Sequence, residues 1–119
     1  MDLKVLLVDD NQPFLRAVQR FLDTLPGVSV VGCAHDGHEA LAQAERLRPD
    51  LVLLDVVMPG MDGFKVALAL KAKPSPPRIV ILSLHDDEAY RAWAHLHGVE
   101  AFVRKDKFTV ELIPIVIQT

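Results

Sequence analysis

The sequence contains little cysteine, no excess of positive charge and no long apolar run. Cys33 is the only cysteine among 119 residues, which excludes an internal disulfide and suits a reducing compartment. A net charge of −3 gives no broad basic field, so direct nucleic-acid binding by this segment is not expected. No apolar run approaches the roughly 20 residues that a membrane helix needs, and the acidic N-terminal stretch is too short for a signal peptide. We therefore expect a cytoplasmic protein with no part in a membrane.

Repeats and low-complexity tracts are also missing, and the composition predicts one globular domain over residues 1–119. Half of the residues are hydrophobic and 24% are charged, which argues against disorder. Apolar runs typical of strands buried on both faces lie at residues 3–8, 28–34, 51–54, 79–82 and 100–104. Helical spacing or capping residues mark the segments 11–25, 36–47, 64–73 and 86–98, and a last helix is expected after 104. This alternation predicts an α/β fold with an open, doubly wound parallel sheet, because five units are too few to close a barrel of eight.

Polar side chains stand at or just past the ends of four predicted strands. Asp9 and Asp10 follow the first strand, Asp55 the third, Ser83 the fourth and Lys105 the fifth. Since ligands bind beyond the carboxyl ends of the strands in such a sheet, these side chains should converge on one rim. Three carboxylates repel one another, and a hard divalent cation such as magnesium relieves that repulsion. A lysine and a serine suit contacts with phosphoryl oxygens, so the sequence predicts a site that accepts and holds a phosphoryl group.

These residues, together with the stretch 55–63 (Asp-Val-Val-Met-Pro-Gly-Met-Asp-Gly), resemble the receiver domains of bacterial response regulators over nearly the whole chain. The resemblance implies a flavodoxin-like three-layer sandwich with the strand order 2-1-3-4-5. It also implies that Asp55 takes phosphate from a sensor histidine kinase. The output is then controlled through the face made by the fourth helix, the fifth strand and the fifth helix.

The resemblance assigns a role to each site residue. It implies that Mg²⁺ or Mn²⁺ is held by three carboxylates and one backbone carbonyl, those of Asp9, Asp10, Asp55 and Val57. Ser83 and Lys105 are then expected to contact the phosphoryl oxygens. Phe102 matches the aromatic switch position, where movement of Ser83 toward phosphate leaves room for the ring to turn inward.

Three positions depart from the family pattern. Leu84 follows Ser83 where alanine is frequent, and we expect it, with Val57 and His85, to modulate access to the acceptor and slow dephosphorylation. Asp106 stands where proline is frequent, so the preceding peptide should be trans, because a cis bond costs about 3 kcal/mol without proline. Pro114 falls inside the expected last helix, which should therefore be kinked, shifted or shortened.

The sequence allows two interpretations of what this domain controls. The segments 83–88 and 105–106 are similar to receivers fused to helix-turn-helix DNA-binding domains, which favours control of transcription by a domain outside these 119 residues. A stand-alone relay protein is the alternative. The face named above is also a candidate surface for pairing with a second copy. The expected partners are thus a sensor kinase and an output domain or downstream protein. Direct binding of this segment to nucleic acid or to a membrane is not expected.

Other interpretations compete with this one. A flavodoxin-like cofactor binder needs a phosphate-cradling loop after the first strand, but residues 9–13 are acidic and include a proline. An aspartate-nucleophile phosphatase commonly has a second acid where Val57 stands. A receiver-like interaction module that never accepts phosphate is a third class. Taken singly, an aspartate after a strand is often a helix cap, Ser83 can satisfy a turn, and Phe102 can be packing. The histidines are read as solvated, and Tyr90 and Trp93 as core or partner contacts.

Overall fold

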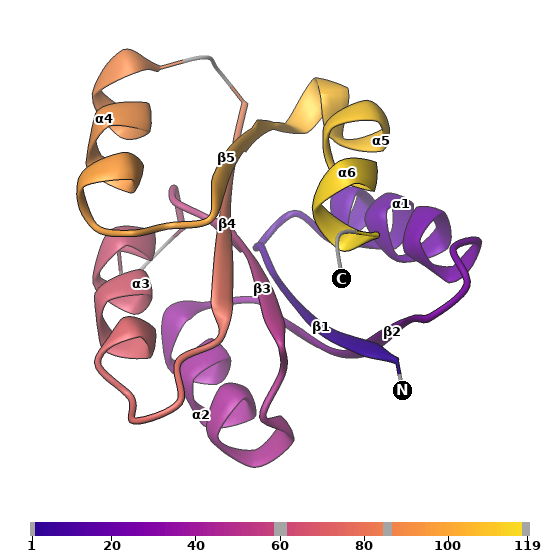
Figure 1. The fold of residues 1–119 in the computed structure, drawn as a ribbon, viewed down its shortest axis with the longest axis horizontal. Coiled ribbons are helices and arrows are strands. Elements are labelled where there is room, and N and C mark those ends of the chain that lie inside the picture. Colours follow the sequence, from indigo (N-terminus) through magenta and orange to yellow (C-terminus); the bar gives the residue numbers. More distant parts are fainter. Residues whose placement is uncertain (1, 59–61, 85–86, 118–119) are drawn as a thin grey trace.

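The structure is a computed structural model that describes residues 2–58, 62–84 and 87–117. Its five parallel strands form one sheet in the order β2-β1-β3-β4-β5, drawn in Figure 1. The strands are β1 (Leu3–Val8), β2 (Val28–Ala34), β3 (Leu51–Asp55), β4 (Arg78–Ser83) and β5 (Ala101–Arg104). The helices are α1 (Gln12–Asp23), α2 (Gly37–Leu47), α3 (Gly63–Lys71), α4 (Glu88–Leu96), α5 (Phe108–Glu111) and α6 (Ile113–Val116), with a 3-10 turn η1 (Lys105–Lys107). The predicted strand order is confirmed.

The sheet is buried on both faces, which gives the molecule three layers. Alternate strand residues point to opposite sides, so that Leu6 and Val8 of β1 pack in one hydrophobic cluster and Val5 and Leu7 in another. The first cluster contains residues of α2, α3 and α4, and the second contains residues of α1 and α6. Figure 1 shows α2, α3 and α4 on one face and α1, α5 and α6 on the other. The predicted flavodoxin-like sandwich is therefore observed.

Short polar side chains start the helices where the sequence predicts. The Asn11 side-chain oxygen accepts a hydrogen bond of 3.0 Å from the Phe14 N–H at the start of α1. Asp36 caps α2 by accepting a 2.8 Å hydrogen bond from the Glu39 N–H, and Asp87 caps α4. Observed element bounds differ from the predicted ones by a residue or two. The caps fix the entry of each helix next to the carboxyl ends of the strands.

The C-terminal helix is broken, as the position of Pro114 predicts. Two four-residue helices, α5 and α6, meet at Leu112, and Pro114 lies in the first turn of α6, where its missing N–H is not required. Leu112 and Val116 are buried against the sheet, whereas Val110 is exposed. Within the described residues every peptide bond is trans, including the one before Asp106.

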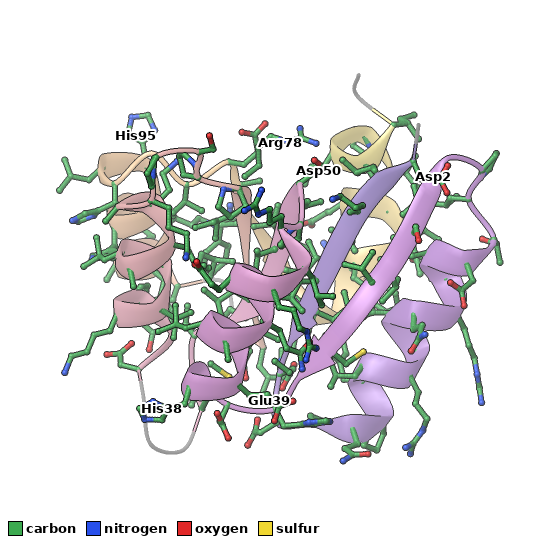
Figure 2. The ribbon with its side chains drawn as sticks, turned by 90° about the horizontal axis from the view of Figure 1, so that it is seen from below. Asp2, His38, Glu39, Asp50, Arg78 and His95 are labelled. Atoms are coloured by element: carbon green, nitrogen blue, oxygen red, sulfur yellow. The ribbon has the colours of Figure 1, made fainter. Side chains whose placement is uncertain are left out.

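Hydrogen bonds join the amino-terminal ends of three strands. Lys4 donates its N–H to the Asp50 side chain at 2.8 Å and accepts the Asp50 N–H at the same distance. Arg78 then donates its N–H to the Asp50 carbonyl at 2.9 Å. Figure 2 shows Asp50 and Arg78 at the end of the molecule opposite His38 and Glu39, which start α2. In the described part of the chain, no helix is long and apolar enough to cross a membrane.

An aromatic column packs α3 against α4. The Phe64 ring lies 5.1 Å from Tyr90 and 4.4 Å from Trp93, measured between centroids, and Trp93 stacks on His97 at 4.2 Å. His97 also uses Nδ1 in a 2.9 Å hydrogen bond with the Trp93 carbonyl. The interpretation of all histidines as solvated is wrong for His97, because the i, i+4 spacing on α4 places its ring on Trp93.

Candidate functional site

The residues at the strand ends meet on one rim, as the topology requires. The buried polar or charged residues of the described ranges are Asp9, Asp55, Ser83 and Lys105. Together with Asp10 they line or adjoin a cavity of about 360 Å³. Each follows or ends a strand of the parallel sheet, which delivers all five to the carboxyl edge.

Lys105 is the cation of this site. Its Nζ atom lies 2.5 Å from Oδ2 of Asp9 and 3.5 Å from Oδ2 of Asp55. The lysine side chain is only 8% exposed, and those of Asp9 and Asp55 are 1% and 6% exposed. A buried lysine needs such counter-charges, because transfer of an unpaired ammonium from water costs several kcal/mol.

The three aspartates form an oxygen-rich cluster. One carboxylate oxygen from each of Asp9, Asp10 and Asp55 lies within 4.8 Å of the others, and Asp10 is exposed while the other two are buried. Oδ1 of Asp9 accepts the Asn11 N–H at 3.0 Å. Among the described atoms, Oδ2 of Asp9 has the ion-pair contact with Lys105 but no hydrogen bond of acceptable geometry. A buried oxygen with spare acceptor capacity is what a hard cation such as Mg²⁺ uses as a ligand, so the residues fit the predicted metal.

The surroundings of Asp55 raise the pKa of its carboxyl group. Burial, and then the neighbouring charge of Asp9, raise the pKa of Asp55 to about 6, against the opposing effects of Lys105 and of the Val57 N–H. That N–H donates to Oδ1 of Asp55 at 3.2 Å. The carboxylate is therefore held in one orientation at the cavity and is ionised at neutral pH.

Gly63 allows the chain after β3 to pass close to Asp55. A methyl group at Gly63 would lie 2.5 Å from the Asp55 carbonyl oxygen and 2.5 Å from Cα of Val56. The Gly63 N–H donates to the Val56 carbonyl at 3.2 Å, which joins the start of α3 to the residue after β3. Glycine is required at this position by the close backbone contact.

The predicted access residues that the structure describes are exposed at the cavity, whereas the predicted switch residue is buried. Val57 and Leu84 line the cavity, and each is 67% exposed. His85 lies outside the described residues. Phe102 is buried in the cluster beneath α4, and the Arg91 guanidinium lies 4.6 Å from its ring centroid. Its ring therefore lies inside the core and not half-exposed at the sheet edge.

Besides the helix caps Asn11 and Asp87, which also line the cavity, two residues at the site were not predicted. Tyr90 of α4 lines the cavity, and the ring of Phe14 lies 4.8 Å from Nζ of Lys105. Helical spacing in the sequence indicates only that each is on an inward face. The packing of α1 and α4 against opposite faces of the sheet, which brings these two residues to the site, is a tertiary feature.

A larger cavity, of about 580 Å³, lies at the amino-terminal end of the strands. Two of its charged residues form ion pairs. Lys73 pairs with Glu45 of the same cavity at 2.5 Å, and Arg78 pairs with the neighbouring Glu100 at 3.7 Å. It contains none of the aspartates of the carboxyl edge, and we therefore assign the chemistry to the smaller cavity.

The sequence and the fold match those of known proteins. The model of the response regulator receiver domain family matches residues 5–117. The chain belongs to this family. It is a receiver domain of two-component response regulators, whose family function is phosphorylation at an acidic, Mg²⁺-binding site.

Among its relatives are two regulators named NarL. The "probable transcriptional regulatory protein NarL" of Mycobacterium tuberculosis is 37% identical over 115 residues, which is 97% of this chain and 53% of the relative. The nitrate/nitrite response regulator protein NarL of Escherichia coli K12 is 34% identical over 109 residues, 92% of this chain and 50% of the relative. The chain thus spans about half the length of these curated relatives.

Solved receiver structures have the same fold. The signal receiver domain of the M. tuberculosis NarL superposes with a TM-score of 0.89 at 37% identity, over 98% of this chain and 94% of that one. The response regulator domain of Thermotoga maritima CheB gives a TM-score of 0.87 at 29% identity, over 99% and 96%. These relatives therefore include a probable transcriptional regulatory protein and CheB, and the receiver is the part they share with this chain.

Proposed function

We propose that Asp55 accepts a phosphoryl group from a sensor histidine kinase and that residues 1–119 act as a single receiver domain. The observation that carries this proposal is the buried Asp55 carboxylate at the cavity, oriented by the Val57 N–H and faced by the Lys105 ammonium. As part of a two-component system, the protein is expected to act in the cytoplasm.

Mg²⁺, or Mn²⁺ in its place, would be held by the carboxylates of Asp9, Asp10 and Asp55 and by the Val57 carbonyl. This ligand set is supported by the spare acceptor capacity of Oδ2 of Asp9 and by three carboxylate oxygens that lie within 4.8 Å of one another. When bound, the metal neutralises charge on the transferring phosphoryl group.

The side chains of the chain supply the rest of the chemistry. An Asp55 oxygen attacks phosphorus, and a new O–P bond forms while the P–N bond to the donor histidine breaks. Lys105 and Ser83 contact the phosphoryl oxygens, the lysine by charge and the serine by donating one hydrogen bond. The domain thereby assists its own phosphorylation and dephosphorylation without being an enzyme that acts on a separate substrate.

Phosphorylation is proposed to change the face formed by α4, β5 and α5. Ser83 lies at the cavity and Phe102 packs under α4, so a shift of Ser83 toward phosphate would alter the space available to that ring. Pairing with a second copy through this face, and control of transcription by a DNA-binding output domain, are the proposed consequences. The M. tuberculosis relative, which is named as a probable transcriptional regulatory protein, supports that output.

The test is mass spectrometry of the intact protein after incubation with acetyl phosphate and Mg²⁺. We expect a gain of one phosphoryl group that is lost in Asp55→Asn and retained in Asp62→Asn, an exposed cap of α3. A gain that survives in Asp55→Asn would overturn the assignment. No gain in the wild type would favour the interaction module that never accepts phosphate.

A further inference from the structure

The ammonium of Lys105 contacts an aromatic ring as well as the acidic cluster. Its Nζ atom lies 4.8 Å from the centroid of Phe14, within the distance at which the electron-rich face of a ring attracts a cation. The same atom is 2.5 Å from Oδ2 of Asp9. Because Lys105 is largely shielded from solvent, both attractions are weakly screened.

Other contacts hold the Phe14 ring in place. Its backbone N–H donates to the Asn11 cap of α1 at 3.0 Å, and its ring meets Phe108 of α5 edge-on at 5.5 Å. Phe21 lies two turns further along α1 and contacts the same Phe108 ring, with 5.6 Å between the ring centroids. Lys105 has a long, flexible side chain, so the ring is the fixed partner of this contact and the ammonium is the movable one.

The geometry points to Phe14 as a positioning residue that holds the Lys105 ammonium beside Asp9 and thereby weakens the binding of Mg²⁺. This inference rests on the metal site of the proposed function. A divalent cation that binds Oδ2 of Asp9 would share this oxygen with the ammonium, and repulsion between the two positive charges would push the ammonium away. Displacement also separates the ammonium from the ring, so the attraction between Phe14 and Lys105 adds to the cost of metal binding.

The measurement is the dissociation constant of Mg²⁺ for the unphosphorylated protein, determined by isothermal titration calorimetry. Phe14→Leu keeps an apolar side chain without the ring face, and we expect the constant to fall by roughly 3- to 10-fold. Phe14→Trp provides a ring that attracts cations more strongly and should raise the constant. Phe21→Leu is the matched control, since it also removes a ring from Phe108, and it should leave the constant at the wild-type value.

A second arm separates positioning from packing. In the Lys105→Met background there is no ammonium to hold, so Phe14→Leu should cause no further change in the dissociation constant. Trifluorophenylalanine at position 14 keeps the shape of the ring while removing its negative face, and should reproduce the effect of Phe14→Leu. This variant decides the question if Phe14→Leu does not fold.

Two results would overturn the inference: equal constants for the wild type and the ring-weakened variants, or an effect of Phe14→Leu that persists without Lys105. If the wild type binds Mg²⁺ and is phosphorylated on Asp55, either result removes only the role of Phe14. If the wild type binds no Mg²⁺, the metal site is itself wrong and the inference is overturned with it.

Discussion

Lys105 reaches Asp9 across two intervening strands. Nζ lies 2.5 Å from Oδ2 of Asp9, although β5 and β1 are separated by β4 and β3 in the sheet. The contact is shorter than the 3.5 Å separation from Asp55. In the unphosphorylated protein the lysine therefore neutralises the most deeply buried carboxylate of the cluster, and both partners depend on the contact for their burial.

Removal of the lysine should destabilise the metal-free protein. Lys105→Met leaves Asp9 and Asp55 buried without their counter-charge, and we expect the free energy of unfolding at pH 7 to fall by about 3 kcal/mol. Saturating Mg²⁺ should restore most of the loss, because the metal replaces the missing positive charge. Urea titrations with and without Mg²⁺ provide the measurement. Lys107→Met, at an exposed neighbour, is the control, and an equal loss there would contradict the prediction.

The raised pKa of Asp55 predicts a pH-dependent stability. With a pKa of about 6 in the folded state and 3.8 as the ordinary value, native Asp55 keeps a proton that the unfolded chain has released between about pH 4 and 6. The free energy of unfolding should therefore decrease as pH rises through this window, by on the order of 2–3 kcal/mol relative to Asp55→Asn. Urea titrations of both proteins from pH 4 to 7 measure it. A constant difference across the window would show that Asp55 is not perturbed.

Leu84 is predicted to protect the phosphorylated state. Its exposed side chain lines the cavity beside Asp55, where it limits the approach of water. Leu84→Ala should shorten the half-life of the acyl phosphate several-fold. The half-life is measured by the rate at which inorganic phosphate is released. Leu96→Ala removes an exposed leucine of α4 that does not line this cavity and should leave the half-life unchanged. Equal half-lives in all three proteins would rule out a protective role.

Gly63 should be intolerant of a side chain. In Gly63→Ala the new methyl group meets backbone atoms of Asp55 and Val56 at 2.5 Å, and backbone cannot yield without moving the end of β3. We expect a loss of stability of about 3 kcal/mol or more. Gly32→Ala is the comparison, because there the methyl group meets only side-chain atoms, at 2.5 Å from Gln43, 2.8 Å from Leu47 and 3.3 Å from Leu6, and side chains yield more easily than backbone. Chemical denaturation of both variants tests the difference, and similar losses would contradict it.

The alternation of strands and helices and the rim of polar residues were predictable because they follow from local patterns, whereas the strand order was implied by the resemblance to receiver domains. Short apolar runs mark strands, and the topology of a parallel sheet then brings Asp9, Asp55 and Lys105 together without any further information. The break at Pro114 was predictable for the same reason, since proline acts on its own turn.

The remaining details depend on contacts between distant segments. Lys105 lies closer to Asp9 than to Asp55. The position of its flexible side chain depends on the combined attraction of both carboxylates. The position of the Phe14 ring beside the ammonium depends on how α1 packs against α5. The burial of Phe102 depends on Arg91 and α4 covering the edge strand. Periodicity in the sequence contains no information on these distances.

The aromatic column between α3 and α4 gives the protein an internal optical probe. Trp93 is the only tryptophan of the chain, and it lies between Phe64 and His97, on the helix that also brings Tyr90 to the cavity. Its fluorescence therefore reports on the packing of α4, with no second indole to obscure the signal. Stopped-flow fluorescence of the unlabelled protein after mixing with acetyl phosphate and Mg²⁺ can thus follow the change proposed for this helix in time.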